Sequence, residues 1–379
     1  MLKHEWIRVA LGMYVVAFGA NLFAPMVITY QRFTGLNSLQ TTFLFGIYAA
    51  GLIVALFVGG PLSDTHGRRA IIRPALACTA LGSAILLSGH TGTFPLLLLG
   101  RLTIGVAVGL AMSSGAAWMK ELSPTVAVGA QRSSLALTLG FASAPLVSGL
   151  LAQFAPHPTV TPYVAHLALA AGIIPLTWGA PARPPEGRQR AWLPRSLLTK
   201  KFLPVTLYGP WVFGCASTAF GFLPIMLTQH TTMPIAVAGF IAMLTMGAGA
   251  VTQPFAVRFS ATVGMAAAVA GMALAFVIVH NAEHPWALWL LPIDAIIMGF
   301  AYGTNMVNGL AETQHLAPAH ELGAATGVFY TIIYLGFFAP FILSFLSPRV
   351  GNDTTFAFGI VAATITMLLT AYFHRAKRG

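Results

Sequence analysis

The stretch Gly60-Pro-Leu-Ser-Asp-Thr-His-Gly-Arg-Arg69 is a short polar turn between two long apolar runs. Residues 40–58 before it carry no charge, and residues 70–89 after it carry only Arg73. Each run is about as long as the ~20 residues that a helix needs to cross a bilayer. Because the turn is so short, the first helix must end, and the second begin, at the same membrane face. The arginines in and just after the turn assign that face to the cytoplasm, where Lys and Arg accumulate.

The overall composition is that of a protein surrounded mostly by lipid. Of its 379 residues, 57% are hydrophobic and only 8% are charged, against roughly 25% charged in soluble domains. The net charge of +11 does not indicate nucleic-acid binding, because the basic residues recur between apolar segments instead of gathering on one face. Cys78 and Cys215 fall in apolar runs far apart in the sequence, which predicts buried thiols and no disulfide framework.

Apolar segments of this length recur along the whole chain and predict twelve membrane-spanning helices. The first six cover residues 6–30, 38–62, 70–89, 94–119, 133–154 and 162–180. The second six cover residues 202–227, 234–257, 261–280, 285–310, 322–346 and 353–373. Between the two sets lies a Pro- and Arg-rich stretch that we interpret as a cytoplasmic linker. The expected domains are therefore a bundle over 1–180, a linker over 181–201 and a bundle over 202–379.

The positions of the basic residues predict the topology. With the N-terminus inside, all 20 Lys and Arg residues except Arg32, Arg101 and Arg349 fall on the cytoplasmic face. Misplacing one helix would reverse the alternation from that point onward, so the pattern favours an even number of spans and two cytoplasmic termini. We expect a multi-pass protein of the plasma membrane, in particular a bacterial inner membrane.

The two halves also share motifs in the same order. Residues 60–64 recur as 249–253, residues 105–109 as 299–303, and residues 139–145 as 335–340, at offsets of 189 to 196 residues. A single match is weak, because Gly-x-x-x-Gly is common wherever membrane helices pack closely. Three matches in order at nearly one offset indicate an internal duplication, as in membrane proteins built from two repeats.

The turn, with its spacing Gly-x-x-x-Asp-x-x-Gly-Arg-Arg, resembles the loop between the second and third helices of major facilitator superfamily transporters. Two further motifs are similar to those of the family's 12-helix drug or metabolite:proton antiporters: Arg101-x-x-x-Gly105 in the fourth helix, and Gly140-x-x-x-Ala-Pro145-x-x-Ser-Gly149 in the fifth. In the second motif, Ala and Ser replace two of the family's glycines. The resemblance implies an all-α fold of two pseudo-symmetric six-helix bundles that open alternately to either side of the membrane.

The resemblance also implies gating roles for the turn and the fifth helix. In the family, the aspartate that matches Asp64 caps the eleventh helix, whose free N–H groups and dipole attract a carboxylate; Glu321 would compete for that place. Arg68 or Arg69 could pair with Glu121. The open alternatives are a turn that only anchors the topology and a fifth helix with an ordinary packing face. The expected gating residues are Gly60, Asp64, Gly67, Arg68, Arg69, Glu121, Gly140, Pro145 and Gly149.

Polar side chains gather in the first, fourth, seventh and tenth predicted helices, which occupy equivalent positions in each half. Polar groups in a bilayer are costly and usually face the protein interior or a wet cavity. In the resembled family these four helices line the central cavity. The candidate substrate-binding residues, all but Met246 in these helices, are Asn21, Arg101, Tyr208, Trp211, Met246, Asp294, Tyr302, Asn305 and Asn308.

Arg101 and Asp294 are the two full charges deep within predicted spans, each ~10–14 Å below the outer membrane face at 1.5 Å per helical residue. We predict that they share the cavity, with Arg101 binding substrate or a proton-linked partner and Asp294 taking up and releasing a proton. The alternative is structural: Arg101 holds backbone carbonyls and polar side chains, and Asp294 stabilises a neighbouring helix. Glu312, near the cytoplasmic end of its helix, is the second candidate for the proton.

Together these features predict a secondary transporter that exports a small amphipathic or aromatic molecule in exchange for protons. The alternative is a proton symporter or facilitator that imports a metabolite such as a sugar or organic acid. An enzyme is not expected, because no nucleophile, base or metal-ligand cluster lies at membrane depth, and no Gly-x-x-x-x-Gly-Lys-Ser/Thr loop indicates an ATP-driven pump. We expect no cofactor and no metal. The expected partners are the substrate, protons and the lipid bilayer, with no nucleic acid and a monomeric chain.

Overall fold

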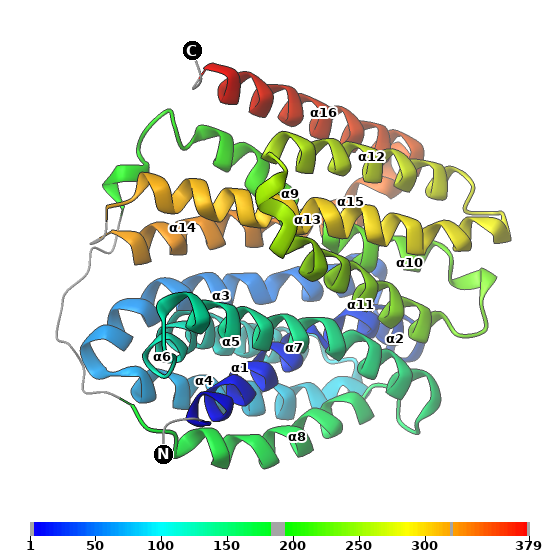
Figure 1. The fold of residues 1–379 in the computed structure, drawn as a ribbon. Helices are drawn as coiled ribbons and strands as arrows, with labels where there is room; N and C mark the ends of the chain where they lie inside the picture. The colour runs from blue at the N-terminus through cyan, green and yellow to red at the C-terminus, as the bar shows by residue number, and fades with distance from the viewer. Residues whose placement is uncertain (1–3, 183–193, 319–320, 377–379) are drawn as a thin grey trace. The chain divides into compact units, whose positions relative to one another are not determined.

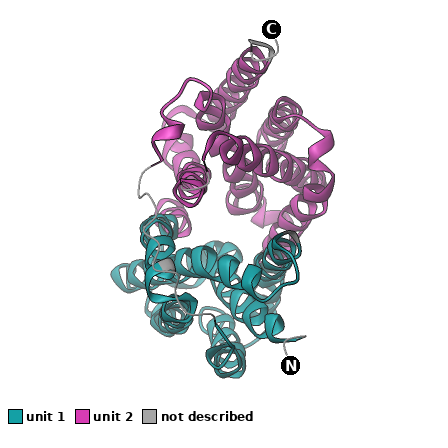
Figure 2. Ribbon diagram, turned by 60° about the vertical axis from the view of Figure 1, so that its left-hand side comes forward, with its two compact units in different colours: residues 1–37, 47–192 teal, residues 38–46, 193–379 magenta. Residues whose placement is uncertain are grey.

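The structure, a computed structural model, describes residues 4–182, 194–318 and 321–376, without the side chains of Asp64, Ala127, Arg375 and Ala376. Every regular element in these ranges is a helix (Figure 1). The helices form two units, residues 1–37 with 47–192 and residues 38–46 with 193–379 (Figure 2). The boundary after residue 192 lies inside the predicted linker, while the start of the second predicted span groups with unit 2. The division at 180 and 202 stays a prediction.

Unit 1 holds two spans that are assembled from several helical pieces. The first is interrupted at Leu22, and the fourth is continued by a π-helical turn, η2. The elements are α1 (Glu5–Asn21), α2 (Phe23–Thr34), most of α3 (Ser38–His66), α4 (Arg68–Leu86), η1 (Leu87–Thr91), α5 (Phe94–Leu110), η2 (Ala111–Gly115), α6 (Ala116–Glu121), α7 (Val126–Phe154) and α8 (Thr161–Trp178).

Unit 2 is likewise interrupted in its first span, at Phe222, but its other interruption, the 3₁₀ turn η7, lies in its fifth span. Its elements are η3 (Arg195–Leu197), α9 (Leu203–Gly221), α10 (Leu223–Met226), η4 (Thr228–His230), α11 (Pro234–Thr252), η5 (Gln253–Arg258), α12 (Ala261–His280), η6 (Pro285–Leu290), α13 (Leu291–Leu316), α14 (Leu322–Tyr334), η7 (Leu335–Phe338), α15 (Ala339–Val350) and α16 (Asn352–Ala376).

Eleven helical stretches among the described residues are long and apolar enough to cross a membrane. They correspond to every predicted span except 162–180. There α8 has only 18 residues and includes Pro162, His166 and Pro175, which lower its mean hydropathy. An all-α, multi-pass membrane protein is therefore confirmed. The crossing of α8, the total of twelve spans and the cytoplasmic termini stay predictions.

Helix boundaries differ from prediction where polar residues extend an apolar run. α7 begins at Val126 instead of residue 133, because the Thr125 hydroxyl caps it and accepts the Val128 N–H at 3.2 Å. α13 continues to Leu316 instead of residue 310. Its polar last turns are engaged by neighbouring helices of unit 2, as described below. Hydropathy alone ends these helices too early because such partners are not visible in it.

Glycines let helices approach backbone to backbone in both units. A Cβ on Gly105 of α5 would lie 2.0 Å from the carbonyl oxygen of Tyr48 in α3. In unit 2, a Cβ on Gly303 of α13 would lie 2.4 Å from the carbonyl oxygen of Gly249 in α11. The repeated Gly-x-x-x-Gly motif therefore packs the fourth span on the second and, in unit 2, the tenth on the eighth.

The spans differ in how far the protein encloses them. In each span we compare the 18 consecutive residues that are most apolar. The protein buries 89% of these residues in the first span and 78% in α9–α10, but only 17% in α16. α16 leaves large apolar side chains such as Phe358 and Leu368 more than half exposed. Such a face suits lipid tails.

Candidate functional site

The polar turn between α3 and α4 depends on Gly67. Its φ of 88° lies in the region that favours glycine, and α4 begins at the next residue. A Cβ on Gly60 would meet nothing within 4 Å, so packing does not require glycine there. The side chain of Asp64 lies outside the described residues, and its contact with the eleventh span stays a prediction.

Arg68 is the centre of a polar cluster within unit 1. Its Nε donates to Glu121 Oε1 at 2.8 Å and its Nη1 to Ser63 Oγ at 3.0 Å. Ser63 donates to Ser114 Oγ at 3.0 Å, and Ser114 donates to the Arg68 carbonyl oxygen at 3.0 Å. The Arg68 and Glu121 side chains are only 13% and 20% exposed. The cluster joins the start of α4 to η2 and to the end of α6.

Arg69, the other predicted partner of Glu121, is used differently. Its Nε donates to the Ala180 carbonyl oxygen at 2.6 Å, and Arg73 Nη2 donates to the Trp178 carbonyl oxygen at 3.0 Å. The last carbonyls of a helix lack internal donors and carry partial negative charge, so arginines stabilise them in both respects. The neighbouring arginines of the turn therefore bind different parts of unit 1: Arg68 the end of α6, Arg69 the end of α8.

Arg101 on α5 is 1% exposed and surrounded by groups of unit 1. Its Nη1 donates to the Ala20 carbonyl oxygen at 3.1 Å. The guanidinium carbon lies 4.3 Å from the ring centroid of Phe23 and 4.6 Å from that of Tyr48, within the range of cation–π attraction. Arg101 thus holds the break between α1 and α2, which matches the structural alternative. A contact with substrate stays a prediction.

Asn21 and Ser148 join this break to α7. Pro145 has no N–H, so the carbonyl oxygen of Phe141, four residues earlier, loses its helical donor. Asn21 Nδ2 donates to that oxygen at 2.7 Å. In return, Ser148 Oγ donates to the Leu22 carbonyl oxygen at 2.7 Å. Asn21, predicted to bind substrate, is 4% exposed and occupied by this bond.

The small residues of the antiporter-like motif lie against α1. A Cβ on Gly140 would lie 2.6 Å from the carbonyl oxygen of Tyr14. Ala144, one turn further, is completely buried, and Gly149 is buried as well. The motif therefore serves close packing of α7 on α1. Its role in gating stays a prediction.

Asp294 lies in the first turn of α13 and is completely buried. Neither of its carboxyl oxygens has a hydrogen-bond partner in the part of the chain that the structure describes. Cys215 of α9 lies within electrostatic range of it, but a thiol is a weak donor. An ionised carboxylate without partners costs several kcal/mol in such surroundings, so this arrangement suits the protonated acid.

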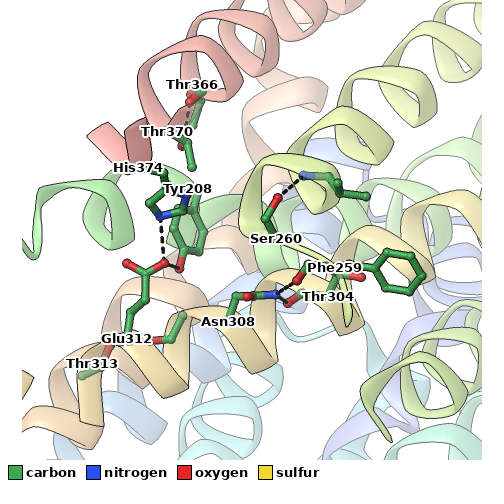
Figure 3. A network of polar contacts seen from close by, with 12 residues as sticks. Tyr208, Phe259, Ser260, Thr304, Asn308, Glu312, Thr313, Thr366, Thr370 and His374 are labelled. Carbon is green, nitrogen blue, oxygen red and sulfur yellow. Dashed lines mark hydrogen bonds and ion pairs between the residues drawn. The ribbon is translucent and has the colours of Figure 1, made fainter. Parts of the chain in front are cut away.

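Two other predicted contacts on α13, Asn305 and Asn308, also lie within unit 2. Asn308 Nδ2 donates to the Phe259 carbonyl oxygen at 3.0 Å (Figure 3). Asn305 is fully buried, with its Nδ2 3.7 Å from Met265 Sδ. Its Oδ1 has no partner among the described residues. Both amides are thus turned toward neighbouring helices of unit 2.

Tyr302 and Met246 are the apolar part of the predicted site. Tyr302 stacks on Phe213 of α9, with ring centroids 5.3 Å apart. Met246 is 4% exposed in α11. Both residues contribute to the packing of unit 2 in this structure.

A cluster that the sequence did not predict lies where α9, α13 and α16 meet (Figure 3). Tyr208 donates its hydroxyl to Glu312 Oε1 at 3.4 Å, and His374 Nε2 lies 2.9 Å from the same oxygen. Trp211, one helical turn after Tyr208, donates to Thr366 Oγ1 at 3.3 Å. His374 carried no signal in the sequence, because a lone histidine at the end of an apolar run has no informative spacing.

The predicted substrate residues thus belong to separate clusters within single units. Unit 1 contains Asn21 and Arg101, and unit 2 contains Tyr208, Trp211, Met246, Asp294, Tyr302, Asn305 and Asn308. The cavity that Arg101 and Asp294 were predicted to share stays a prediction.

The two helical units repeat their membrane-spanning segments, an arrangement found in membrane proteins built from internal repeats. Residues 9–340 match the Major Facilitator Superfamily. The chain belongs to this family. The family suggested by the polar turn is confirmed, whereas the antiporter group within it stays a prediction.

Relatives of this chain move different solutes. The glucose transporter GlcP of Staphylococcus epidermidis is 30% identical over 141 residues, which are 37% of this chain and 31% of GlcP. The bacillibactin exporter of Bacillus subtilis is 25% identical over 152 residues, 37% of each chain. This chain therefore spans only a minor part of the length of the curated relatives it matches, from 17% of the human proton myo-inositol cotransporter to 37% of the bacillibactin exporter.

A solved structure matches nearly the whole chain. The D-xylose-proton symporter superposes with a TM-score of 0.75 at 14% identity, covering 97% of both chains. At this identity the likeness establishes the fold alone.

Proposed function

We propose that this transporter couples the movement of a small organic molecule to that of protons, with Asp294 as the proton-carrying carboxyl. The observation that supports it is the complete burial of Asp294 without a hydrogen-bond partner among the described residues. A buried neutral acid with an unsatisfied polar atom costs about 1–3 kcal/mol, much less than an isolated buried ion. A conformation that admits water or a cationic partner would favour the ionised form, so one proton would bind and leave in each cycle.

Export by antiport is the first candidate for the direction. The antiporter-like motif of α7 and the presence of a bacillibactin exporter among the relatives support it. The substrate would then be a small amphipathic or aromatic compound. Import of a sugar by symport is the second candidate, favoured by the similarity to a bacterial glucose transporter.

Proton movement in reconstituted vesicles tests the coupling and its direction. The purified chain is placed in liposomes that contain a pH-sensitive dye, with potassium and valinomycin clamping the membrane potential. D-glucose, D-xylose or the aromatic cation ethidium is added outside. Antiport makes the lumen alkaline as solute enters, symport makes it acidic, and facilitated diffusion moves labelled solute without a pH change.

The variant Asp294→Asn should abolish the pH change while retaining solute binding. Asp353→Asn is the matched control, because Asp353 is an exposed carboxylate of the same unit, paired with His280 at 2.9 Å. It should behave as the wild type. A wild-type pH change in Asp294→Asn would refute the assignment of the proton to this residue.

A further inference from the structure

Pro145 in α7 and Pro340 in α15 occupy corresponding places in the two repeats. They end the matching segments 139–145 and 335–340. Each proline lacks an N–H, so the carbonyl oxygen four residues earlier loses its α-helical donor. These oxygens belong to Phe141 and Gly336. A buried backbone carbonyl is nearly always paired, so each of them requires a donor from elsewhere.

Both oxygens receive that donor from the first span of their own unit. Asn21 Nδ2, at the end of α1, donates to the Phe141 oxygen at 2.7 Å. Ser217 Oγ, in α9, donates to the Gly336 oxygen at 3.0 Å. Asn21 is 4% exposed and Ser217 is completely buried, so water does not compete for either bond.

Asn21 and Ser217 are 196 residues apart, which equals the offset between residues 139 and 335 and is one more than the offset of 195 between the two prolines. The two donors therefore occupy the same position of the duplicated unit to within one residue. One is an amide and the other a hydroxyl, so the repeats share the hydrogen-bond donor and not the residue type. If the task of this position is to donate a hydrogen bond to the carbonyl that the proline leaves without a helical donor, either an amide or a hydroxyl can perform it.

The two bonds differ in one respect. In unit 2 the helix tightens into the 3₁₀ turn η7, and the Ala339 N–H also donates to the Gly336 oxygen. In unit 1, α7 stays α-helical through Pro145, and Asn21 donates to the Phe141 oxygen. Loss of the side-chain donor should therefore matter more in unit 1 than in unit 2.

We propose that Asn21 and Ser217 are equivalent positioning residues that replace the amide donors removed by Pro145 and Pro340. Each joins the first and fifth spans of its unit beside the proline of the fifth span. The proline-containing helix and its partner then move as one body when the protein changes state. Asn21 acts on the helix pair and not on the substrate, so the inference does not depend on the substrate or on proton coupling.

A double-mutant cycle on thermal unfolding of the purified full-length chain in detergent tests this inference without any substrate. Asn21→Leu keeps the side-chain volume but removes the donor. It should lower Tm by about 4 °C, from the cost of one unsatisfied buried carbonyl in a protein of this size. Pro145→Ala restores an N–H within α7. In that background, Asn21→Leu should change Tm by less than about 1 °C, because the carbonyl no longer needs the amide.

Equal losses of Tm from Asn21→Leu in both backgrounds would overturn the inference, because ordinary packing or a place in a substrate site predicts no coupling to Pro145. The pair Ser217→Ala and Pro340→Ala forms a second cycle, which remains informative if Pro145→Ala does not fold. The coupling there should have the same sign and be smaller, because Ala339 also serves the Gly336 oxygen. Absence of coupling in this second cycle would refute the equivalence of the repeats.

Hydrogen exchange monitors the joined motion directly. In the wild type, amides of residues 10–30 and 137–150 should open with the same free energy, as one cooperative unit. The two segments should separate in Asn21→Leu and coincide again in Asn21→Leu with Pro145→Ala. Unchanged exchange in Asn21→Leu would contradict the joined movement.

Discussion

Substitution of Gly105 by alanine tests the close packing of α5 on α3. The added Cβ would lie 2.0 Å from the Tyr48 carbonyl oxygen, where ordinary contact begins near 3.4 Å. This oxygen is a backbone atom and has no rotamer to relieve the overlap, so the two helices must separate by roughly 1.4 Å, the difference between these distances. Overpacking of this kind costs about 1–3 kcal/mol, while alanine returns about 0.5–1 kcal/mol of helix propensity.

Gly105→Ala should therefore lower the free energy of unfolding by about 0.5–2 kcal/mol, which would lower Tm by several °C. Unfolding can be followed with a thiol-reactive dye, because Cys215 is completely buried in the folded chain and becomes reactive on unfolding. Gly247→Ala is the matched control: this glycine also lies within a span, but its added Cβ would meet nothing within 4 Å. It should be neutral or slightly stabilising. The packing argument fails if Gly105→Ala is at least as stable as Gly247→Ala.

Three further substitutions test the charged side chains of unit 1 by the same thermal assay. The stability losses of Arg68→Ala and Glu121→Ala should show a coupling energy of about 1 kcal/mol. This is at the upper end of the range for exposed ion pairs, because both side chains are mostly buried. The coupling energy should fall in 1 M salt, and additive stability losses would show that the ion pair contributes nothing. Arg101→Lys should lower the free energy of unfolding by about 1–3 kcal/mol, because a lysine ammonium does not reproduce a planar guanidinium lying over Phe23 and Tyr48. Wild-type stability in this variant would refute the cation–π account.

The same chemistry explains why several predicted substrate residues are engaged elsewhere. Asn21 and Arg101 were singled out because polar groups in a span need a reason to be there. Both find that reason in backbone carbonyls beside a helix break. A break or a proline in a helix leaves backbone acceptors without their helical donors, and a nearby amide or guanidinium satisfies them. Asp294 remains the exception, since no such partner occupies it among the described residues.

The position of most spans followed from the sequence because hydropathy is a local property. Residues 261–280 were predicted as a helix and form α12 with those bounds. The turn at Gly67 was also visible, because a glycine before two arginines ends one apolar run and begins another. The partner of Glu121 was left open between Arg68 and Arg69, because the two arginines are adjacent in the sequence and either side chain could reach it. His374 was missed entirely, since its partner Glu312 lies 62 residues away.

The motif of the polar turn indicated the family, and composition and the spacing of apolar runs, by themselves, determined that this chain is a helical membrane protein. They could do so because the solvation of a helix in lipid depends on the residues of that helix alone. Only the tertiary structure decided which polar groups meet: that Arg68 and not Arg69 reaches Glu121, that Asn21 serves a carbonyl freed by Pro145, and that Asp294 has no partner among the described residues. Hydrogen bonds between helices depend on rotation and separation to within an ångström, and residues far apart in the chain set both.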